Sequence, residues 1–365
     1  MRKLTDTEPG PRKSVCLKVP KQYGEKTLVL ANSLKIVNRE MEIRRDKDSI
    51  CIPLLRKLSV NESRNLEEHV RDYRVSTHIF PERKKRKPSI TELLKEKLPQ
   101  RLLAVLPHSA DFVGDIAIIE VSSELDQYKN IIGEAILKAN KNVRTVLAKA
   151  GVVSGTYRVR EFSVIAGEVR TDTIHKEYGC QYYVDVAKAY FSPRLSYEHS
   201  RVTSLVKEGE TVIDLFAGVG PFAIQIAKNH ERVKVYAVDA NPQAIEYLKR
   251  NIRLNRVDEK VHPILGDAGQ VVNEELSHIA DRVIMNLPEK AIEFVNASCK
   301  AISPLVGVVH YYCFANASDS LDTVKEIFVE AVEKCGRKVD EILFFRRVRA
   351  TAPYEWQIAL DARIH

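Results

Sequence analysis

The carboxyl-terminal half of the chain alternates strand-like and helix-like segments, and this alternation most constrains the fold. Seven apolar, β-branched segments are expected to form strands, at residues 211–216, 233–239, 261–265, 282–286, 307–314, 339–348 and 356–362. Helical stretches separate the first five strands, which predicts a parallel, doubly wound sheet. Only about seven residues join the last two strands, too few for a crossover helix. We therefore expect the seventh strand to run antiparallel.

The turn after the first strand carries two glycines. Gly218 and Gly220 permit unusual backbone angles and the close approach of a ligand. The spacing Gly218-x-Gly220-x-x-Ala223 also satisfies the fingerprint of nicotinamide dinucleotide sites. The turn alone therefore does not decide between a nicotinamide dinucleotide and S-adenosylmethionine as the cofactor. A seven-stranded sheet with an antiparallel last strand resembles the class I S-adenosylmethionine-dependent methyltransferase fold, whereas the dinucleotide-binding fold has six parallel strands.

Acidic residues follow three successive strands of the expected sheet. Asp214 ends the first, where a carboxylate suits the cationic methionine end of S-adenosylmethionine and not a pyrophosphate. Asp239 ends the second and is expected to accept the ribose hydroxyls. Asp267 follows the third and is expected at the adenine amino group, although both later acids could instead cap helices. Because the strands end at one edge, we expect the cofactor crevice there.

The tetrapeptide Asn286-Leu287-Pro288-Glu289 follows the fourth strand. It resembles, incompletely, the N/D-P-P-Y/F motif of methyltransferases that act on planar amide or amine nitrogens. Leucine replaces the first proline and glutamate replaces the aromatic residue, so base stacking on Glu289 is not expected.

Basic residues cluster in the first third of the chain. The protein has 365 residues and a net charge of +8, and residues 81–101 contain eight basic and three acidic side chains. Five basic residues are consecutive: Arg83, Lys84, Lys85, Arg86 and Lys87. Flanking prolines indicate an exposed linker, which is either a solvated connector or a strap that contacts nucleic-acid phosphates.

Length and local pattern predict three domains. We expect a small α/β recognition module at residues 1–80, a basic linker at 81–88, a middle α/β (α+β) domain at 89–190 and the sheet domain at 191–365. No apolar run approaches the roughly 20 residues of a membrane span, and the amino terminus is no signal peptide, so a soluble cytoplasmic protein without membrane contact is expected. The six cysteines form no C-x-x-C pair; they are interpreted as reduced core thiols, and no metal site is expected.

Two further segments carry charged side chains at regular spacing. Ser192 and Pro193 predict a helix start, after which Arg194, Glu198 and Arg201 would share one face. Surface ion pairs would give the same spacing. Upstream, Arg158 and Arg160 would lie on one side of a strand at 156–162, where solvent-facing arginines are also common.

Together these segments resemble the archaeal and eukaryotic tRNA (guanine-37-N1)-methyltransferases. The resemblance is carried by residues 157–161, 173–177, 191–195, 214–222 and 286–288, and it is looser before residue 120. It implies S-adenosylmethionine as the cofactor and tRNA as the partner, held at its outer corner and anticodon loop by a monomeric enzyme.

The resemblance also implies roles for individual residues. Guanine N1 becomes nucleophilic only as its proton leaves and charge builds on O6, which calls for a base and a cation. Glu198 would be the base and Arg158 the O6 stabiliser, and Asn286 would hold the base edge. The residues expected at the cofactor are Tyr190, Asp214, Phe216, Gly218, Gly220, Asp239, Asp267, Asn286 and Pro288. Those expected at the tRNA are residues 83–87, Arg160 and Arg194. His199 stands where many archaeal relatives have an arginine, so its role is open.

Several alternatives stay open. Related enzymes also methylate a wyosine precursor at the same nucleotide, and another branch transfers the aminocarboxypropyl arm of the cofactor. A catalytically silent tRNA-binding protein would be expected to lose the acidic rim that this chain retains. A nicotinamide oxidoreductase is disfavoured by the antiparallel last strand.

Overall fold

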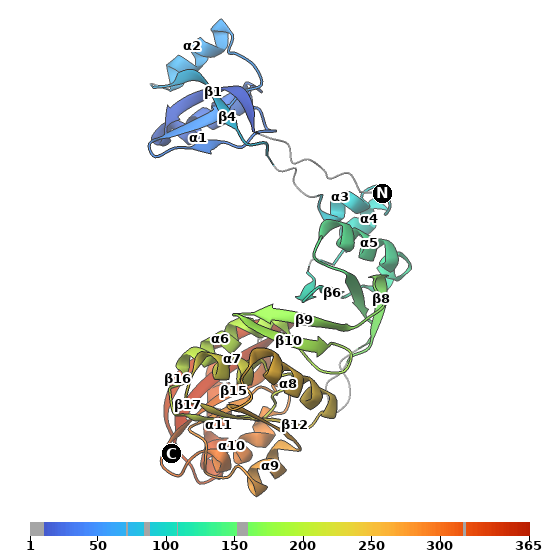
Figure 1. Ribbon diagram of the computed structural model, residues 1–365, viewed down its shortest axis with the longest axis vertical. Helices are drawn as coiled ribbons and strands as arrows, with labels where there is room; N and C mark the ends of the chain where they lie inside the picture. The colour runs from blue at the N-terminus through green and yellow to red at the C-terminus, as the bar shows by residue number, and fades with distance from the viewer. Residues whose placement is uncertain (1–10, 71, 84–87, 108, 152–159, 317–318) are drawn as a thin grey trace. The chain divides into compact units, whose positions relative to one another are not determined.

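The chain divides into two compact units, Met1–Pro88 and Ser89–His365. A computed structural model describes residues 11–70, 72–83, 88–107, 109–151, 160–316 and 319–365, and Figure 1 shows the elements of each unit. No helix in these described ranges is long and apolar enough to cross a membrane.

The first unit is an antiparallel four-stranded sheet with two helices. The strand order is β2-β3-β1-β4, with bounds β1 Arg12–Pro20, β2 Arg44–Arg45, β3 Ser49–Pro53 and β4 Arg74–Phe80. Helices α1, Gly24–Ser33, and α2, Val60–His69, contribute to the core that contains Leu17 and Val19 of β1. Because side chains alternate along a strand, Cys16 faces the opposite side, where it packs with Cys51, Phe80 and Met41.

The second unit begins with a small mixed sheet. Its strand order is β5-β6-β7-β8, with bounds β5 Asp111–Val113, β6 Ile116–Ile119, β7 Thr145–Lys149 and β8 Phe162–Gly167. The helical elements beside it are α3 Ile90–Leu94, α4 Gln100–Leu103, the 3₁₀ helix η2 Ser123–Tyr128 and α5 Lys129–Ala139. Ser89 and Glu92 exchange side-chain and backbone hydrogen bonds and so form a capping box at the start of α3. Most of the strand predicted at 156–162 lies outside the described residues.

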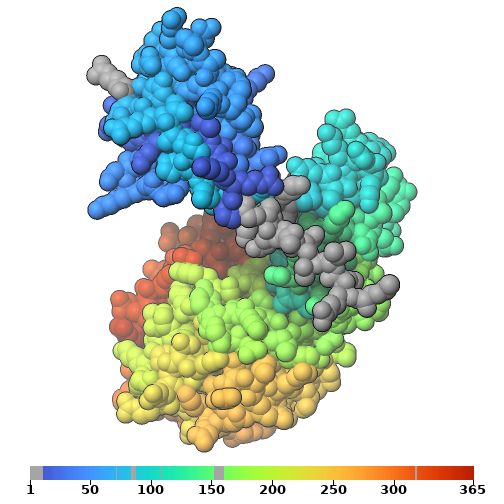
Figure 2. Space-filling model, turned by 45° about the horizontal axis from the view of Figure 1, so that its top comes forward, coloured from blue at the N-terminus to red at the C-terminus, as the bar shows by residue number. Residues whose placement is uncertain are grey.

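A two-stranded hairpin follows and packs on the sheet domain. It consists of β9, Asp172–Glu177, and β10, Cys180–Asp185. Asn251 and Asn255, one turn apart on helix α8, accept hydrogen bonds of 2.7 and 2.9 Å from backbone N–H groups of β10. Strand β10 therefore lies against α8 (Figure 1), and the yellow-green and yellow parts of the second unit adjoin in the space-filling view (Figure 2).

The last part of the unit is the predicted seven-stranded sheet. Its order is β13-β12-β11-β14-β15-β17-β16, and β17 is antiparallel to both of its neighbours. The bounds are β11 Thr211–Asp214, β12 Lys234–Asp239, β13 Val261–Leu265, β14 Arg282–Met285, β15 Gly307–Asn316, β16 Val339–Ala352 and β17 Glu355–Ile364. The predicted parallel strands and the antiparallel last strand are both confirmed.

Helices cover both faces of this sheet and form two separate cores. On one face pack α6 Ser196–Leu205, α7 Pro221–Asn229 and α8 Pro242–Asn255. On the other pack α9 Ala268–Glu274, α10 Val295–Ala301 and α11 Leu321–Lys334. Burial of both faces explains why the parallel strands read as near-continuous apolar runs.

Candidate active site

A cavity of about 320 Å³ opens at the carboxyl edge of the seven-stranded sheet. Six residues predicted at the cofactor line it: Tyr190, Phe216, Gly218, Asp239, Asp267 and Asn286. Three others do not line it: Asp214, Gly220 and Pro288. A crevice at the carboxyl ends of parallel strands is where ligands bind in open α/β sheets.

The two glycines of the turn have different structural roles. Gly218 lines the cavity at φ 55°, and its N–H donates a 2.7 Å hydrogen bond to Oδ2 of Asp239. Gly220 precedes α7 at φ 92°, and a Cβ there would lie 2.4 Å from Cδ1 of Leu248. Gly220 is therefore needed for helix packing, and Gly218 forms part of the cavity wall.

Asp239 and Asp267 form an acidic rim on the cavity. Each oxygen of Asp239 accepts a backbone hydrogen bond, 2.7 Å from Gly218 and 2.8 Å from Asn241, so the carboxylate is fixed in orientation. Burial raises the pKa of Asp239, although these hydrogen bonds oppose the effect. Asp267 caps α9 through Gln270 and also lines the cavity, so its capping and rim positions coexist.

Asp214 lies at the end of β11 and is completely buried. Its Oδ1 accepts a weak 3.4 Å hydrogen bond from the Phe216 N–H, and its Oδ2 has no hydrogen-bond partner in the described part of the chain. Burial, with the charge of Asp239, raises the pKa of Asp214 to about 7. A buried carboxyl with an unsatisfied oxygen fits a site that receives a cation.

The rest of the cavity combines an apolar aromatic wall with negative charge. Phe216 and Phe294 meet edge to face with ring centroids 4.9 Å apart, and both line the cavity. The charged side chains on the wall, apart from histidine, are Asp239, Asp267, Glu289, Glu293 and Lys290. The excess of four carboxyl groups over one ammonium group suits a cationic ligand, and the two aromatic rings suit a ligand with a planar ring.

Glu198 lies in the first turn of α6 and is only 1% exposed. Its Oε2 accepts hydrogen bonds of 2.9 Å from both the Tyr312 hydroxyl and Nε of Arg201. Its Oε1 is buried and has no hydrogen-bond partner among the described residues. Glu198 does not line the cavity itself, but Leu195 and His199 on either side of it do.

A buried charge network lies behind Glu198. Both amino nitrogens of the Arg201 guanidinium group donate to Asp361 on β17. Burial opposes the charge of Arg201, but the hydrogen bonds to Asp361 and Glu198 outweigh it and raise its pKa. Burial also raises the pKa of Tyr312 well above its usual value, so Tyr312 stays a hydroxyl donor.

His199 is a cavity residue whose place the sequence left open. Its Nδ1 lies 2.6 Å from Oε1 of Glu177, and the other oxygen of Glu177 lies 3.6 Å from Nε2 of His175. Burial raises the pKa of Glu177, but hydrogen bonds and charge from both imidazoles hold it down to about 2. Its position next to Glu198 in the sequence was the one feature that could have predicted that His199 lines the cavity.

The tetrapeptide after β14 is held by the neighbouring strands. Asn286 lines the cavity, and its Oδ1 accepts a 3.4 Å hydrogen bond from Nε2 of Gln357. Pro288 is buried, and its carbonyl accepts a hydrogen bond from the Phe314 N–H. The adjoining residues Leu287 and Glu289 face the cavity instead.

The predicted tRNA contacts are only partly described. Arg158 and residues 84–87 lie outside the described residues, whereas Arg83 and Arg160 lie inside. Arg194 pairs with Asp111, because Pro193–Leu195 form a 3₁₀ turn before α6 begins and Arg194 therefore does not join the Glu198 face. Arg349, which sequence reasoning missed, donates to Ser192 and to the Tyr190 hydroxyl beside the cavity.

Comparison with known proteins agrees with this geometry. Residues 173–340 match the TRM5/TYW2 methyltransferase domain, residues 90–171 the TYW2 N-terminal domain and residues 16–62 the tRNA methyltransferase 5 N-terminal domain. The chain is 40% identical over 351 residues to the tRNA (guanine(37)-N(1))-methyltransferase Trm5b of Pyrococcus abyssi, with 96% of this chain and 99% of the relative covered. The chain belongs to the tRNA (guanine(37)-N(1))-methyltransferase family.

Solved structures of this family share the fold. The crystal structure of Trm5b from Pyrococcus abyssi matches with a TM-score of 0.72 at 40% identity, covering 96% of this chain and 99% of that one. The complex of aTrm5 and tRNALeu matches with a TM-score of 0.70 at 35% identity, covering 96% and 100%. The expected class I methyltransferase fold is thereby confirmed. The tRNA 4-demethylwyosine(37)-methyltransferase Taw21 of Saccharolobus solfataricus is 34% identical over 255 residues, or 69% of this chain and 92% of the relative.

Proposed function

We propose that this protein transfers a methyl group from S-adenosylmethionine to N1 of guanosine 37 in tRNA. One observation carries the proposal. The cavity at the carboxyl edge of the sheet has an acidic rim and is bordered by α6, which carries the buried Glu198. The full-length similarity to Trm5b relatives supports the choice of substrate.

The residues present fit the cofactor. Asp239 would accept the ribose hydroxyls, and the adenine would pack against the aromatic wall of Phe216 and Phe294 beside Asp267. Asp214, with its unsatisfied oxygen, would stabilise the cationic methionine end near Tyr190 and Gly218. When bound, S-adenosylmethionine supplies an electrophilic methyl group on a sulfonium.

Glu198 would remove the proton from guanine N1. Tyr312 and Arg201 occupy Oε2 of the carboxylate, which leaves Oε1 as the atom that takes the proton. Asn286 would hold the base edge with its side-chain amide. Arg158 would stabilise the charge that builds on O6, the role that the family resemblance implies.

The tRNA would be held at two places. Residues 83–87, Arg160 and Arg194 would contact tRNA phosphates. The recognition module at residues 1–80 would grip the outer corner of the tRNA. The linker at residues 81–88 would join it to the middle domain at 89–190, which precedes the catalytic domain at 191–365. The protein would act as a monomer. Guanosine 37 must leave its stack to reach a cavity of this kind.

The product identifies the activity. Unmodified tRNA transcripts with guanosine 37 are incubated with labelled S-adenosylmethionine, digested to nucleosides and analysed by mass spectrometry. We expect 1-methylguanosine from the guanosine 37 transcript and none from a matched adenosine 37 transcript. Absence of 1-methylguanosine, or equal label in both transcripts, would refute the proposal.

A second activity, methylation of a wyosine precursor at position 37, is favoured by the similarity to Taw21. The test offers tRNA carrying 4-demethylwyosine in place of guanosine 37. Methylated tricyclic product at a rate comparable to 1-methylguanosine formation would establish a bifunctional enzyme. A rate indistinguishable from that without enzyme would exclude it.

A further inference from the structure

Three potential metal ligands meet on one face of the first unit's sheet. Cys16 lies on the central strand β1, Cys51 on β3 and His78 on β4. The register pairs Lys18 with Cys51 and Ser14 with His78. Because Ser14, Cys16 and Lys18 alternate on β1, all three ligands project from the same face.

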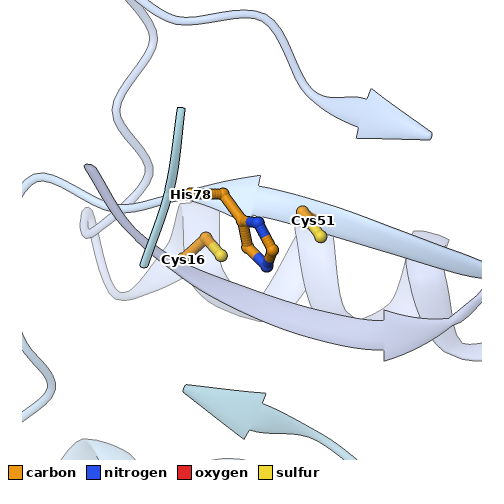
Figure 3. A group of neighbouring side chains, drawn as sticks. All are labelled: Cys16, Cys51 and His78. Atoms are coloured by element: carbon orange, nitrogen blue, oxygen red, sulfur yellow. The ribbon is translucent and has the colours of Figure 1, made fainter. Parts of the chain in front are cut away.

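The ligand atoms lie close together. The two sulfur atoms and an imidazole nitrogen of His78 all lie within 4.8 Å of one another, and Figure 3 shows the His78 ring between the two cysteine side chains. Across the described residues, no other group of three or more histidine, cysteine or acidic side chains meets the same condition. The cluster is thus distinct from the acidic cavity in the second unit.

The surroundings suit a thiophilic cation. Cys16 and Cys51 are completely buried, and His78 is half-buried, so the cluster is closed on the sulfur side and open on the imidazole side. Lys18 and Asp46 both act on Cys51 with opposite electrostatic signs, so they add little net charge. Two thiolates would neutralise a divalent cation.

We propose that Cys16, Cys51 and His78 form a binding site for Zn²⁺, with the fourth position open to water. Zinc accepts cysteine sulfur at about 2.3 Å and histidine nitrogen at about 2.0 Å, which places two sulfurs on a tetrahedral ion roughly 3.8 Å apart. The 4.8 Å limit on the present separations is about 1 Å larger than this sulfur–sulfur distance. Hard cations such as Mg²⁺ are poor candidates for this site, because they prefer oxygen ligands to sulfur.

The site would tie together three strands of a small sheet. Cys16 Sγ also lies 3.3 Å from the Ser76 hydroxyl on β4. A metal bound by the folded unit and not by the unfolded chain stabilises the fold. A zinc ion bound here would stabilise the first unit and would take no part in the methyltransferase chemistry.

The test uses the full-length protein, purified under reducing conditions, stripped with a chelator and titrated with Zn²⁺ and Co²⁺. We expect one equivalent of tightly bound zinc by elemental analysis, and a sulfur-to-cobalt charge-transfer band on Co²⁺ addition. Cys51→Ser should weaken binding by about 100-fold or more and abolish the band. Cys335→Ser, on the second unit, is the matched thiol control and should change neither.

The imidazole is tested separately. Because His78 is partly exposed, its replacement should disturb folding less than replacement of the buried Cys16 or Cys51. His78→Asn should weaken zinc binding by about tenfold or more and shift the cobalt spectrum, whereas His69→Asn on α2 should do neither. No thiolate band with Co²⁺, zinc binding unaffected by Cys51→Ser, or a disulfide between Cys16 and Cys51 under reducing conditions would each overturn the proposal.

Discussion

The hydroxyl of Tyr312 donates a 2.9 Å hydrogen bond to Oε2 of Glu198. Arg201 donates to the same oxygen, so both contacts fix the carboxylate from behind and leave Oε1 without a partner among the described side chains. Tyr312 comes from β15 and Glu198 from α6, so the contact joins the sheet to the helix that borders the cavity. Tyr312 is thus a positioning residue for the proposed base.

Tyr312→Phe should lower kcat by about 10–100-fold with little change in KM for the cofactor, because the carboxylate can then rotate out of line. Stability should fall by about 1–3 kcal/mol, the usual effect of losing a buried hydrogen-bond partner. Steady-state kinetics and chemical denaturation measure both. Tyr311→Phe, a buried neighbour in the core on the other sheet face, is the control. Equal loss of kcat in both variants would contradict a positioning role.

Cofactor affinity should depend on pH through Asp214. Burial raises the pKa of Asp214 to about 7, and a bound cation favours the ionised form. Affinity should therefore rise by about tenfold per pH unit below 7 and level off above it. Calorimetric titration measures it, and Asp214→Asn should bind more weakly with a flatter profile. An unchanged slope in Asp214→Asn would show that another group is responsible.

The raised pKa of Asp214 should also make the free energy of unfolding depend on pH. A carboxyl group whose pKa is raised by folding favours the folded state below its ordinary pKa, and this contribution is lost as pH rises toward 7. Asp214→Asn should remove that decline from the free energy of unfolding of cofactor-free protein. Persistence of the full decline would place the titrating group elsewhere.

Glu177 should contribute acid stability. Its pKa is held at about 2, so its contribution is present above about pH 4.5 and disappears as the pH falls toward 2. Glu177→Gln should lose roughly 2–3 kcal/mol at pH 6, and unfolding should depend less on pH across that window. Glu259→Gln, at an exposed position, is the control and should behave as wild type. A wild-type acid-unfolding curve for Glu177→Gln would contradict the assignment.

Gly220→Ala should destabilise the protein by about 2–4 kcal/mol, because the residue has φ 92° and its Cβ would crowd Leu248. Gly336→Ala separates the two causes. Gly336 has φ 77° but open space where its Cβ would lie, so the backbone cost alone of about 1 kcal/mol is expected. Chemical denaturation compares the two, and equal losses would argue against tight packing of α7 on α8.

The catalytic sheet could be predicted from sequence because each strand is a short apolar run bounded by turn residues. The short connection before Glu355 was enough to fix the direction of β17. The acidic rim followed from this topology, since Asp239 ends β12, Asp267 follows β13, and both strands end at the carboxyl edge of the sheet.

Other parts of the site depend on tertiary contacts that no local pattern encodes. Tyr312 and Asp361 reach Glu198 and Arg201 from strands more than a hundred residues away in sequence. The predicted face shared with Arg194 fails because α6 begins only at Ser196. No metal site was expected because Cys16, Cys51 and His78 have no motif spacing in the sequence, and only the strand register brings them together.

The most direct test of the proposed mechanism is single-turnover formation of 1-methylguanosine at position 37 by wild type and Glu198→Gln. We expect product from wild type and a rate about 10²–10⁴-fold lower in the variant, with cofactor affinity unchanged. Glu330→Gln, an exposed exchange on α11, should retain the wild-type rate. A Glu198→Gln rate equal to that of wild type, or no 1-methylguanosine from wild type, would contradict the account.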